Sequence, residues 1–352
     1  MDLLRRQSIR SFPRSSRWSL VGGSFALLLS GFLVVPLACD DSGGSSNATA
    51  PVSIGVSDAP VEGLAKVVIT IDRIVLNRPG ADLVVDRFTN EDLDIFDEDT
   101  ITVDLLDYRG EDNMLIVGPI DMRVGDYQNL RLEIIDNDIS RSYVQELGGA
   151  IRPIEVPSGE LKLGRFAIED RGDQTFILEF GLRHALTYNP GPDRYILKPR
   201  GVRIVEVSRG ATIGGIVDPD LFDSEAPCDL KPDAFAGNVV YLYRGTALDP
   251  ADLADAFDPE LDLVAAADYL EPFASETVAD DGSYFFAYVP AGPYTLAFSC
   301  DAVDDDPEYD DGIFVPAPED ALVEVSTDPN QSWICDFPVP IGGCALDEPL
   351  AP

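Results

Sequence analysis

Apolar residues in this chain occur in short runs rich in β-branched side chains, and turn residues such as Gly, Pro, Asn and Asp separate the runs. Leu130-Arg131-Leu132-Glu133-Ile134 alternates strictly between apolar and polar positions, which puts its apolar side chains on one face of a strand. No run shows a long helical period. Further strands are predicted at 67–71, 73–76, 176–180, 202–207, 212–217 and 239–243, with a strand, tight turn and strand within 280–296. The pattern predicts an all-β protein built from antiparallel β-sandwiches.

The distribution of these runs predicts two domains. About 300 residues follow the N-terminal segment, which suits two domains of ordinary size. A new strand near Ala211 indicates the boundary, so we expect one β-sandwich at 52–208 and a second at 209–352. In the second, one short helix is expected from Asp249 to Phe257, with Asp249 as its N-cap.

The N-terminus has the order of an export signal. Five arginines precede an apolar segment that ends at Ala38-Cys39, and a polar tether follows at 40–51. Ala38-Cys39 resembles the lipobox of bacterial lipoproteins, although Pro36 stands where that family usually has leucine. The resemblance implies a signal peptide at 1–38 and a lipidated Cys39 that anchors the exported protein to a bacterial membrane, inner or outer. An uncleaved membrane helix and ordinary cleavage are the alternatives, and Arg5-Arg6 leaves twin-arginine export open beside the general secretory route.

The net charge of the chain limits the classes of molecule that we expect it to bind. Removing residues 1–38, which hold five Arg and one Asp, leaves 20 basic and 62 acidic residues and a net charge of −42. Such a surface repels phosphates, so we expect no nucleic acid partner and no contact with anionic lipid headgroups beyond the anchor. A hydrophobic fraction of 45% is high enough for folded cores, so the acidity indicates solubility rather than disorder.

The four cysteines besides Cys39 lie between positions 228 and 344. An exported protein meets an oxidising compartment, so two disulfides are expected. Three pairings are open, and we favour Cys228–Cys300 with Cys335–Cys344, because the second closes a short loop rich in Pro and Gly. A zinc site is disfavoured because the chain has no Cys-x-x-Cys and a single histidine.

Two parts of the chain resemble known families. Residues 52–207 resemble a bacterial domain-of-unknown-function family, number 4382, found in exported lipoproteins. The stretches that carry this resemblance are Val56-Ser57-Asp58-Ala59-Pro60-Val61, Asp104-Leu105-Leu106-Asp107, Gly125 to Leu132, Val156-Pro157-Ser158-Gly159 and Tyr195-Ile196-Leu197-Lys198-Pro199. Asp281-Gly282-Ser283-Tyr284 through Pro290-Ala291-Gly292-Pro293-Tyr294-Thr295-Leu296 resembles the carboxypeptidase-regulatory-like, prealbumin-type sandwich. Neither resemblance brings a catalytic residue, and sugar binding would follow from the second only by analogy of fold.

The sequence contains few residues or motifs that are typical of catalytic sites. His184 is the only histidine, and no nucleophile elbow, zinc-protease motif, dinucleotide motif or phosphate loop is present. A hydrolase built on two carboxylates is the least favoured alternative. The aromatic residues of 284–294 offer stacking platforms for a glycan, but core positions suit them better because strand side chains alternate between faces.

An acidic run after Cys300 is the best candidate for a metal site. Calcium prefers several carboxylate and carbonyl oxygens gathered on a loop, and the spacing does not fit an EF-hand. The expected calcium ligands are Asp304, Asp306, Glu308, Asp310 and Asp311. A solvated acidic loop is the alternative, and a second acidic run at 91–99 suits an exposed hairpin arm better than a cage.

Together these features predict a non-catalytic lipoprotein of the cell envelope, a pair of binding or structural modules. A calcium- or carbohydrate-binding adhesion protein is the main alternative. The sequence does not identify a glycan or protein ligand.

Overall fold

The computed structural model describes residues 48–347 apart from 60, 62, 91–94 and 224–225. Its regular structure is almost entirely β, which confirms the predicted all-β class, and its two α-helical segments are four residues long. No helix in the described part of the chain is long and apolar enough to cross a membrane. The predicted signal peptide and Cys39 lie outside the described residues.

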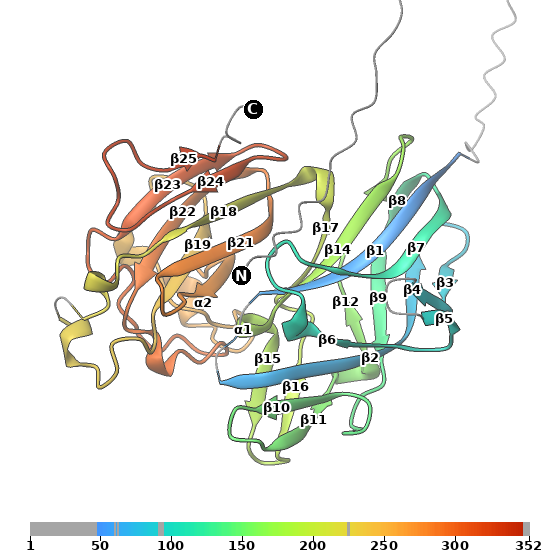
Figure 1. The fold of residues 1–352 in the computed structure, drawn as a ribbon, viewed down its shortest axis with the longest axis horizontal. Coiled ribbons are helices and arrows are strands. Elements are labelled where there is room, and N and C mark those ends of the chain that lie inside the picture. Colours follow the sequence, from blue (N-terminus) through green and yellow to red (C-terminus); the bar gives the residue numbers. More distant parts are fainter. Residues whose placement is uncertain (1–47, 60, 62, 91–94, 224–225, 348–352) are drawn as a thin grey trace, which may run out of the picture. The chain divides into compact units, whose positions relative to one another are not determined.

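Residues 49–206 form two large sheets and two small sheets of two strands each. The elements of this half are β1 (Thr49–Ala59), β2 (Leu64–Asn77), β3 (Leu83–Val85), β4 (Phe88–Asn90), β5 (Ile95–Glu98), β6 (Ile101–Asp104), β7 (Met114–Arg123), β8 (Gly125–Tyr127), β9 (Asn129–Ile134), β10 (Tyr143–Glu146), β11 (Ile151–Glu155), β12 (Glu160–Lys162), β13 (Phe166–Ile168), β14 (Gln174–Gly181), α1 (Leu182–Ala185), β15 (Leu186–Asn189), β16 (Arg194–Leu197) and β17 (Val202–Glu206). The two small sheets pair β4 with β5 and β8 with β13. Of the two large sheets, the one with four strands has the order β17-β14-β1-β7, so β1 lies between β14 and β7 (Figure 1).

The buried residues of this half include the apolar positions that the alternation in the sequence predicted to face the core. In β9 the positions alternate between half-buried and buried, and Leu130, Leu132 and Ile134 point into the core. Apolar side chains of β1 and β2, including Ile54 and Ile69, are buried in the same cluster. The larger sheet has the order β12-β9-β2-β10-β11-β16-β15, with β3 and β6 also paired to β2.

Residues 210–346 form two four-stranded sheets, with orders β21-β18-β24-β25 and β20-β19-β22-β23. Their elements are β18 (Gly210–Ile216), β19 (Val239–Arg244), α2 (Ala265–Asp268), β20 (Ala274–Thr277), β21 (Ser283–Pro290), β22 (Gly292–Ser299), β23 (Leu322–Thr327), β24 (Ser332–Ile334) and β25 (Ala345–Leu346). Phe286 and Phe298, one from each sheet, are among the aromatic residues of one buried cluster. Of the aromatic residues considered as glycan platforms, only Phe285 is half-buried rather than buried, so the expectation of core positions is confirmed.

The structure departs from several sequence expectations. Three strand pairs are parallel: β1 with β14, β11 with β16 and β18 with β24. β1 begins at Thr49, so the last three residues of the predicted tether belong to a strand; Ala50 is 1% exposed. The expected helix at 249–257 is wrong beyond its first turn, because only Pro250–Asp252 forms a 3-10 turn, capped by the Asp249 side chain.

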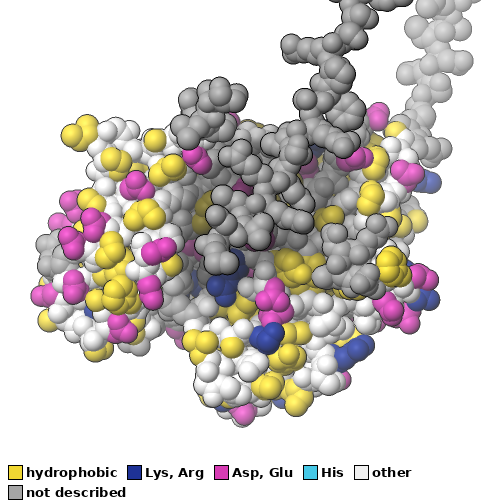
Figure 2. Space-filling view, viewed as in Figure 1, with side chains coloured by type: hydrophobic (Ala, Val, Ile, Leu, Met, Phe, Trp, Pro, Cys, Tyr) yellow, Lys and Arg dark blue, Asp and Glu magenta, His cyan; other side chains and the backbone are white. Residues whose placement is uncertain are grey.

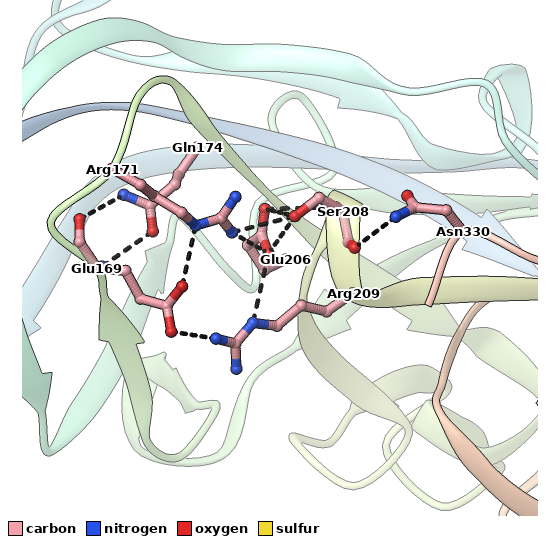
Figure 3. A network of polar contacts seen from close by, with 7 residues as sticks. All are labelled: Glu169, Arg171, Gln174, Glu206, Ser208, Arg209 and Asn330. Atoms are coloured by element: carbon pink, nitrogen blue, oxygen red, sulfur yellow. Dashed lines mark hydrogen bonds and ion pairs between the residues drawn. The ribbon is translucent and has the colours of Figure 1, made fainter. Parts of the chain in front are cut away.

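Apolar and polar contacts join the two sets of sheets where β17 leads into β18. Ile177 and Val205 of the first set are buried together with Tyr288 of β21. Beside them lies a polar network, in which the Arg171 guanidinium contacts Glu206 at 2.6 Å and the Asn330 amide donates to the Ser208 carbonyl at 3.0 Å (Figure 3). Ser46–Pro352 accordingly forms one compact unit.

Candidate functional site

A row of basic side chains from the end of the first half contacts acidic groups of the second. It begins at Arg183 of α1, whose guanidinium contacts Asp305 Oδ2 at 2.7 Å; the two side chains are 11% and 2% exposed. Farther along, Lys198 pairs with Glu308, and Arg200 donates to the Pro307 carbonyl at 3.1 Å. Low exposure excludes most of the solvent screening that makes surface ion pairs weak. These contacts therefore fix residues 183–200 against the acidic loop after Cys300.

His184 lies in this junction, beside a cavity of about 150 Å³. Its Nε2 is 3.0 Å from Ser275 Oγ, and both residues are buried. Burial and the positive charges of Arg200, Arg183 and Arg203 lower the pKa of His184 to about 3. A general base works best with a pKa near the operating pH, so this imidazole is too weak a base to activate Ser275.

Arg203 and Glu276 form the other polar part of the cavity wall. The Arg203 Nε donates to Glu179 at 2.6 Å, and its guanidinium carbon lies 4.4 Å from the centre of the Phe273 ring. Glu276 is buried, and burial together with the nearby charge of Glu179 raises its pKa well above the ordinary value. Two carboxyl groups and a stacked guanidinium in so small a space suit a packed junction rather than a substrate cleft.

Three aspartates meet on the far side of Arg183. Asp255, Asp305 and Asp311 each offer a carboxylate oxygen, and these oxygens lie within 4.8 Å of one another. Asp255 is fully buried, and its Oδ2 accepts hydrogen bonds from the backbone N–H groups of Asp311 and Ile313, at 3.1 and 3.3 Å. The Tyr241 hydroxyl donates to Asp305 Oδ2 at 2.6 Å. We call Asp255, Asp305 and Asp311 the acidic centre.

The acidic centre is electrostatically unfavourable for its own carboxylates. Burial and the adjacent charge of Asp305 raise the pKa of Asp255 to about 8. Asp311 is exposed at the edge of the group, yet burial of part of its side chain raises its pKa as well. Groups with such shifts are candidates for ligand binding.

The expected calcium ligands are only partly brought together. Of the five, Asp311 lies in the acidic centre. Asp306 Oδ1 and Asp310 Oδ1 accept hydrogen bonds from the backbone N–H groups of Glu308 and Gly312, which shapes the loop locally. Glu308 is paired with Lys198, and the side chain of Asp304 lies outside what the structure describes.

Sequence reasoning missed Asp255 and Asp305. Asp305 belongs to the acidic run, but nothing in the run distinguishes it from its neighbours. Asp255 lies 50 positions earlier, in a segment predicted to be helical, and it joins the loop through tertiary packing alone. The partial signal was that Asp255 interrupts an apolar stretch, Leu253-Ala254-Asp255-Ala256-Phe257, in which the other four residues are buried too.

Both favoured disulfides are present. Cys228 pairs with Cys300, and Cys335 pairs with Cys344. Cys228, Cys300 and Cys335 are buried in the core of the second half, and Cys344 packs at its edge. The first disulfide ends directly before the acidic loop, so it fixes the point at which that loop leaves β22.

The surface of the molecule offers no concentrated basic patch on the face drawn in Figure 2. Asp and Glu side chains are spread over the described part of this face, with fewer Lys and Arg among them (Figure 2). The described part of the second acidic run, 95–99, contains the mostly exposed strand β5, which pairs with β4 and agrees with an exposed hairpin arm. Asp97 and Asp99 there contact Arg87.

Comparisons with solved structures give only distant likenesses. The Bacillus anthracis TIE protein is 8% identical with a TM-score of 0.19, and the match covers 82% of this chain and 33% of that one. A streptococcal ancillary pilin is 9% identical with a TM-score of 0.20, covering 79% and 59%. The minor pilin GBS52 of Streptococcus agalactiae is 8% identical with a TM-score of 0.17, covering 81% and 94%. The chain thus spans less than two thirds of the first two proteins, and likenesses at these TM-scores say nothing about its activity.

Comparison with protein families gives a clearer result. No curated protein matches the chain. The family described as "Domain of unknown function (DUF4382)" matches residues 49–199, which agrees with the resemblance seen in the sequence. The match includes β1 to β16 and ends just before β17, and the description of the family names no activity.

Proposed function

We propose that this protein is a non-catalytic structural or binding module of the bacterial cell envelope, exported and anchored through a lipidated Cys39. The observation that carries the proposal is the junction between the two halves. Its ionisable groups, which in an enzyme would be candidates for chemistry, are occupied in holding the halves together.

The environment of the junction's one histidine does not favour catalysis, because this side chain is poorly suited to act as a general acid or base. His184 is buried, its pKa is lowered to about 3 by burial and three arginines, and its hydrogen-bond partner is a buried serine. The cavity beside it, of about 150 Å³, is smaller than the pockets that ordinarily hold small-molecule substrates. Together these features support a structural role for the histidine.

Two features support export. Disulfides persist in oxidising compartments and are rare in the cytosol, and this chain has two of them within one half. The net charge of −42 that remains after removal of residues 1–38 supports a soluble, non-associating surface. A module of this kind, divided into β-sandwiches at 52–208 and 209–352 that contact one another, suits a role in displaying a surface.

The test is the chemical state of Cys39 in cells. The full-length gene is expressed in a bacterial host, the membrane fraction is isolated, and the mature N-terminus is analysed by mass spectrometry. We expect an N-terminal Cys39 that carries a diacylglyceryl group, and a Cys39→Ala variant that is absent from the membrane fraction after detergent-free washing. A mature protein whose Cys39 is unmodified, or a variant that stays in the membrane, would refute the lipid anchor.

A further inference from the structure

Two oxygens of the acidic centre are buried without a hydrogen-bond donor. Among the described residues, nothing donates to Asp255 Oδ1 or to Asp305 Oδ1, although both atoms are inaccessible to solvent. Asp255 is 0% exposed, and the Asp305 side chain is 2% exposed. Burying a carboxylate oxygen without a partner is costly, so native proteins nearly always supply a donor, a water or an ion.

The partner atoms of each carboxylate fix where its second oxygen points. Asp255 Oδ2 is held by two backbone N–H groups, and Asp305 Oδ2 is held by Arg183 and the Tyr241 hydroxyl. Because one oxygen of each group is occupied by these donors, the other is presented in a set orientation. The carboxylates of Asp255 and Asp305 are therefore held in fixed orientations within the acidic centre.

The spacing of the oxygens suits a calcium ion. Calcium binds oxygen ligands at roughly 2.3–2.6 Å, so two ligands on opposite sides of the ion lie about 5 Å apart. One oxygen from each of Asp255, Asp305 and Asp311 falls within 4.8 Å of the others, which allows all three to touch one ion. Exposed Asp311 closes the group on its solvent side, where water molecules can complete the coordination.

The charges of the group also call for a divalent cation. When all three carboxylates are ionised, they carry three negative charges, and Arg183 is the one Lys or Arg of the described chain in an ion pair with any of them. The remaining charge of minus two is matched by one divalent ion. A monovalent ion or a single proton would leave part of it uncompensated.

We propose that Asp255, Asp305 and Asp311 bind a divalent cation with oxygen-ligand preference, and that calcium is the ion that fits. The site differs from the loop-only set expected from the sequence, because its most deeply buried ligand comes from the 249–257 segment. Bound calcium would join that segment to the acidic loop, next to the ion pair of Arg183 with Asp305. This inference is independent of the anchor and would stand if Cys39 were unmodified.

The first measurement is thermal unfolding of the EDTA-stripped protein with and without CaCl₂. At a calcium concentration a hundredfold above Kd, we expect the melting temperature to rise by about 5 °C. Terbium luminescence gives a second measurement, because Tyr241 lies next to Asp305 and can transfer energy to a bound lanthanide. We expect a tyrosine-sensitised signal that CaCl₂ displaces.

Substitutions in the acidic centre test whether its residues cause the calcium shift and the terbium signal. Asp255→Asn and Asp311→Asn keep side-chain size, and each should abolish the calcium shift and the terbium signal. Asp311 is exposed, so its variant is expected to fold even if the Asp255 variant does not. Asp306→Asn is the matched control from the same loop, and it should keep the full response.

Two results would overturn the proposal. A melting temperature that does not change with calcium, together with no terbium signal, would mean that the buried oxygens share a proton instead. A calcium response that persists in Asp311→Asn would mean that the ion binds elsewhere on the acidic surface.

Discussion

The pH dependence of stability gives a direct test of the environment assigned to His184. The folded protein holds this imidazole neutral, with a pKa lowered to about 3 by burial and by Arg200, Arg183 and Arg203. In the unfolded chain the same group has a pKa of about 6.5. Below pH 6.5 the unfolded state therefore binds a proton that the folded state does not, and the stability contributed by neutral His184 is lost as pH falls toward 3.

The magnitude follows from the two pKa values. Over the whole window the difference corresponds to about 5 kcal/mol, at 1.36 kcal/mol for each pKa unit. Between pH 7.5 and pH 5 the histidine accounts for a loss of about 2 kcal/mol. His184→Gln cannot take up the proton, so its free energy of unfolding should fall by about 2 kcal/mol less than that of the wild type over this interval.

Urea denaturation of tag-free protein at pH 7.5 and pH 5 measures this difference. The carboxylates contribute to both proteins alike, so comparing the two pH dependences isolates the histidine. Since the chain contains a single histidine, its NMR signal can be assigned without ambiguity. An imidazole resonance that titrates near pH 6.5 in the folded protein, or equal pH dependences for wild type and variant, would refute the buried and neutral state.

Two further predictions concern stability. The disulfides enclose 72 and 9 residues, so replacing both cysteines by alanine should cost about 4 kcal/mol for Cys228–Cys300 and about 2.5 kcal/mol for Cys335–Cys344 in denaturant unfolding; equal costs would contradict the loop-entropy argument. Gly282 has φ +85°, and a Cβ there would lie 2.2 Å from the Val217 carbonyl oxygen, so Gly282→Ala should cost at least about 3 kcal/mol. Gly312→Ala is the matched control: φ is +68° and no atom lies within 4 Å, so only the backbone cost of about 1–2 kcal/mol is expected, and a similar loss in both variants would rule out the steric effect.

Sequence patterns predicted the strands well where neighbours along the chain determine the structure. The alternation in Leu130–Ile134 fixed which side chains of β9 are buried, and the two strands predicted within 280–296 are β21 and β22. The two runs predicted at 67–71 and 73–76 are one strand, β2. The polar pair Asp72-Arg73 suggested a break, but it lies at an irregularity in the pairing with β9, and the strand continues through it.

Features that depend on residues far apart in the sequence could not be predicted from local patterns. The parallel pairing of β18 with β24 joins residues more than a hundred positions apart, and no local pattern specifies it. The acidic centre is similar, because burial of Asp255 against the loop arises only when the second half is packed. In a chain with 63 acidic residues, local sequence cannot show which three converge.

The position of β1 determines the order in which the first half can fold. β1 is the first described strand to emerge from a ribosome or a translocation channel, yet it pairs with β14 from Val52 opposite Gln174 to Ala59 opposite Gly181. The sheet cannot close until Gly181 has emerged, and pairing over such a sequence distance is slow. Until then the apolar side chains of β1 remain open to misassembly, so this protein should depend on holding chaperones during synthesis and transport more than a domain closed by local hairpins would.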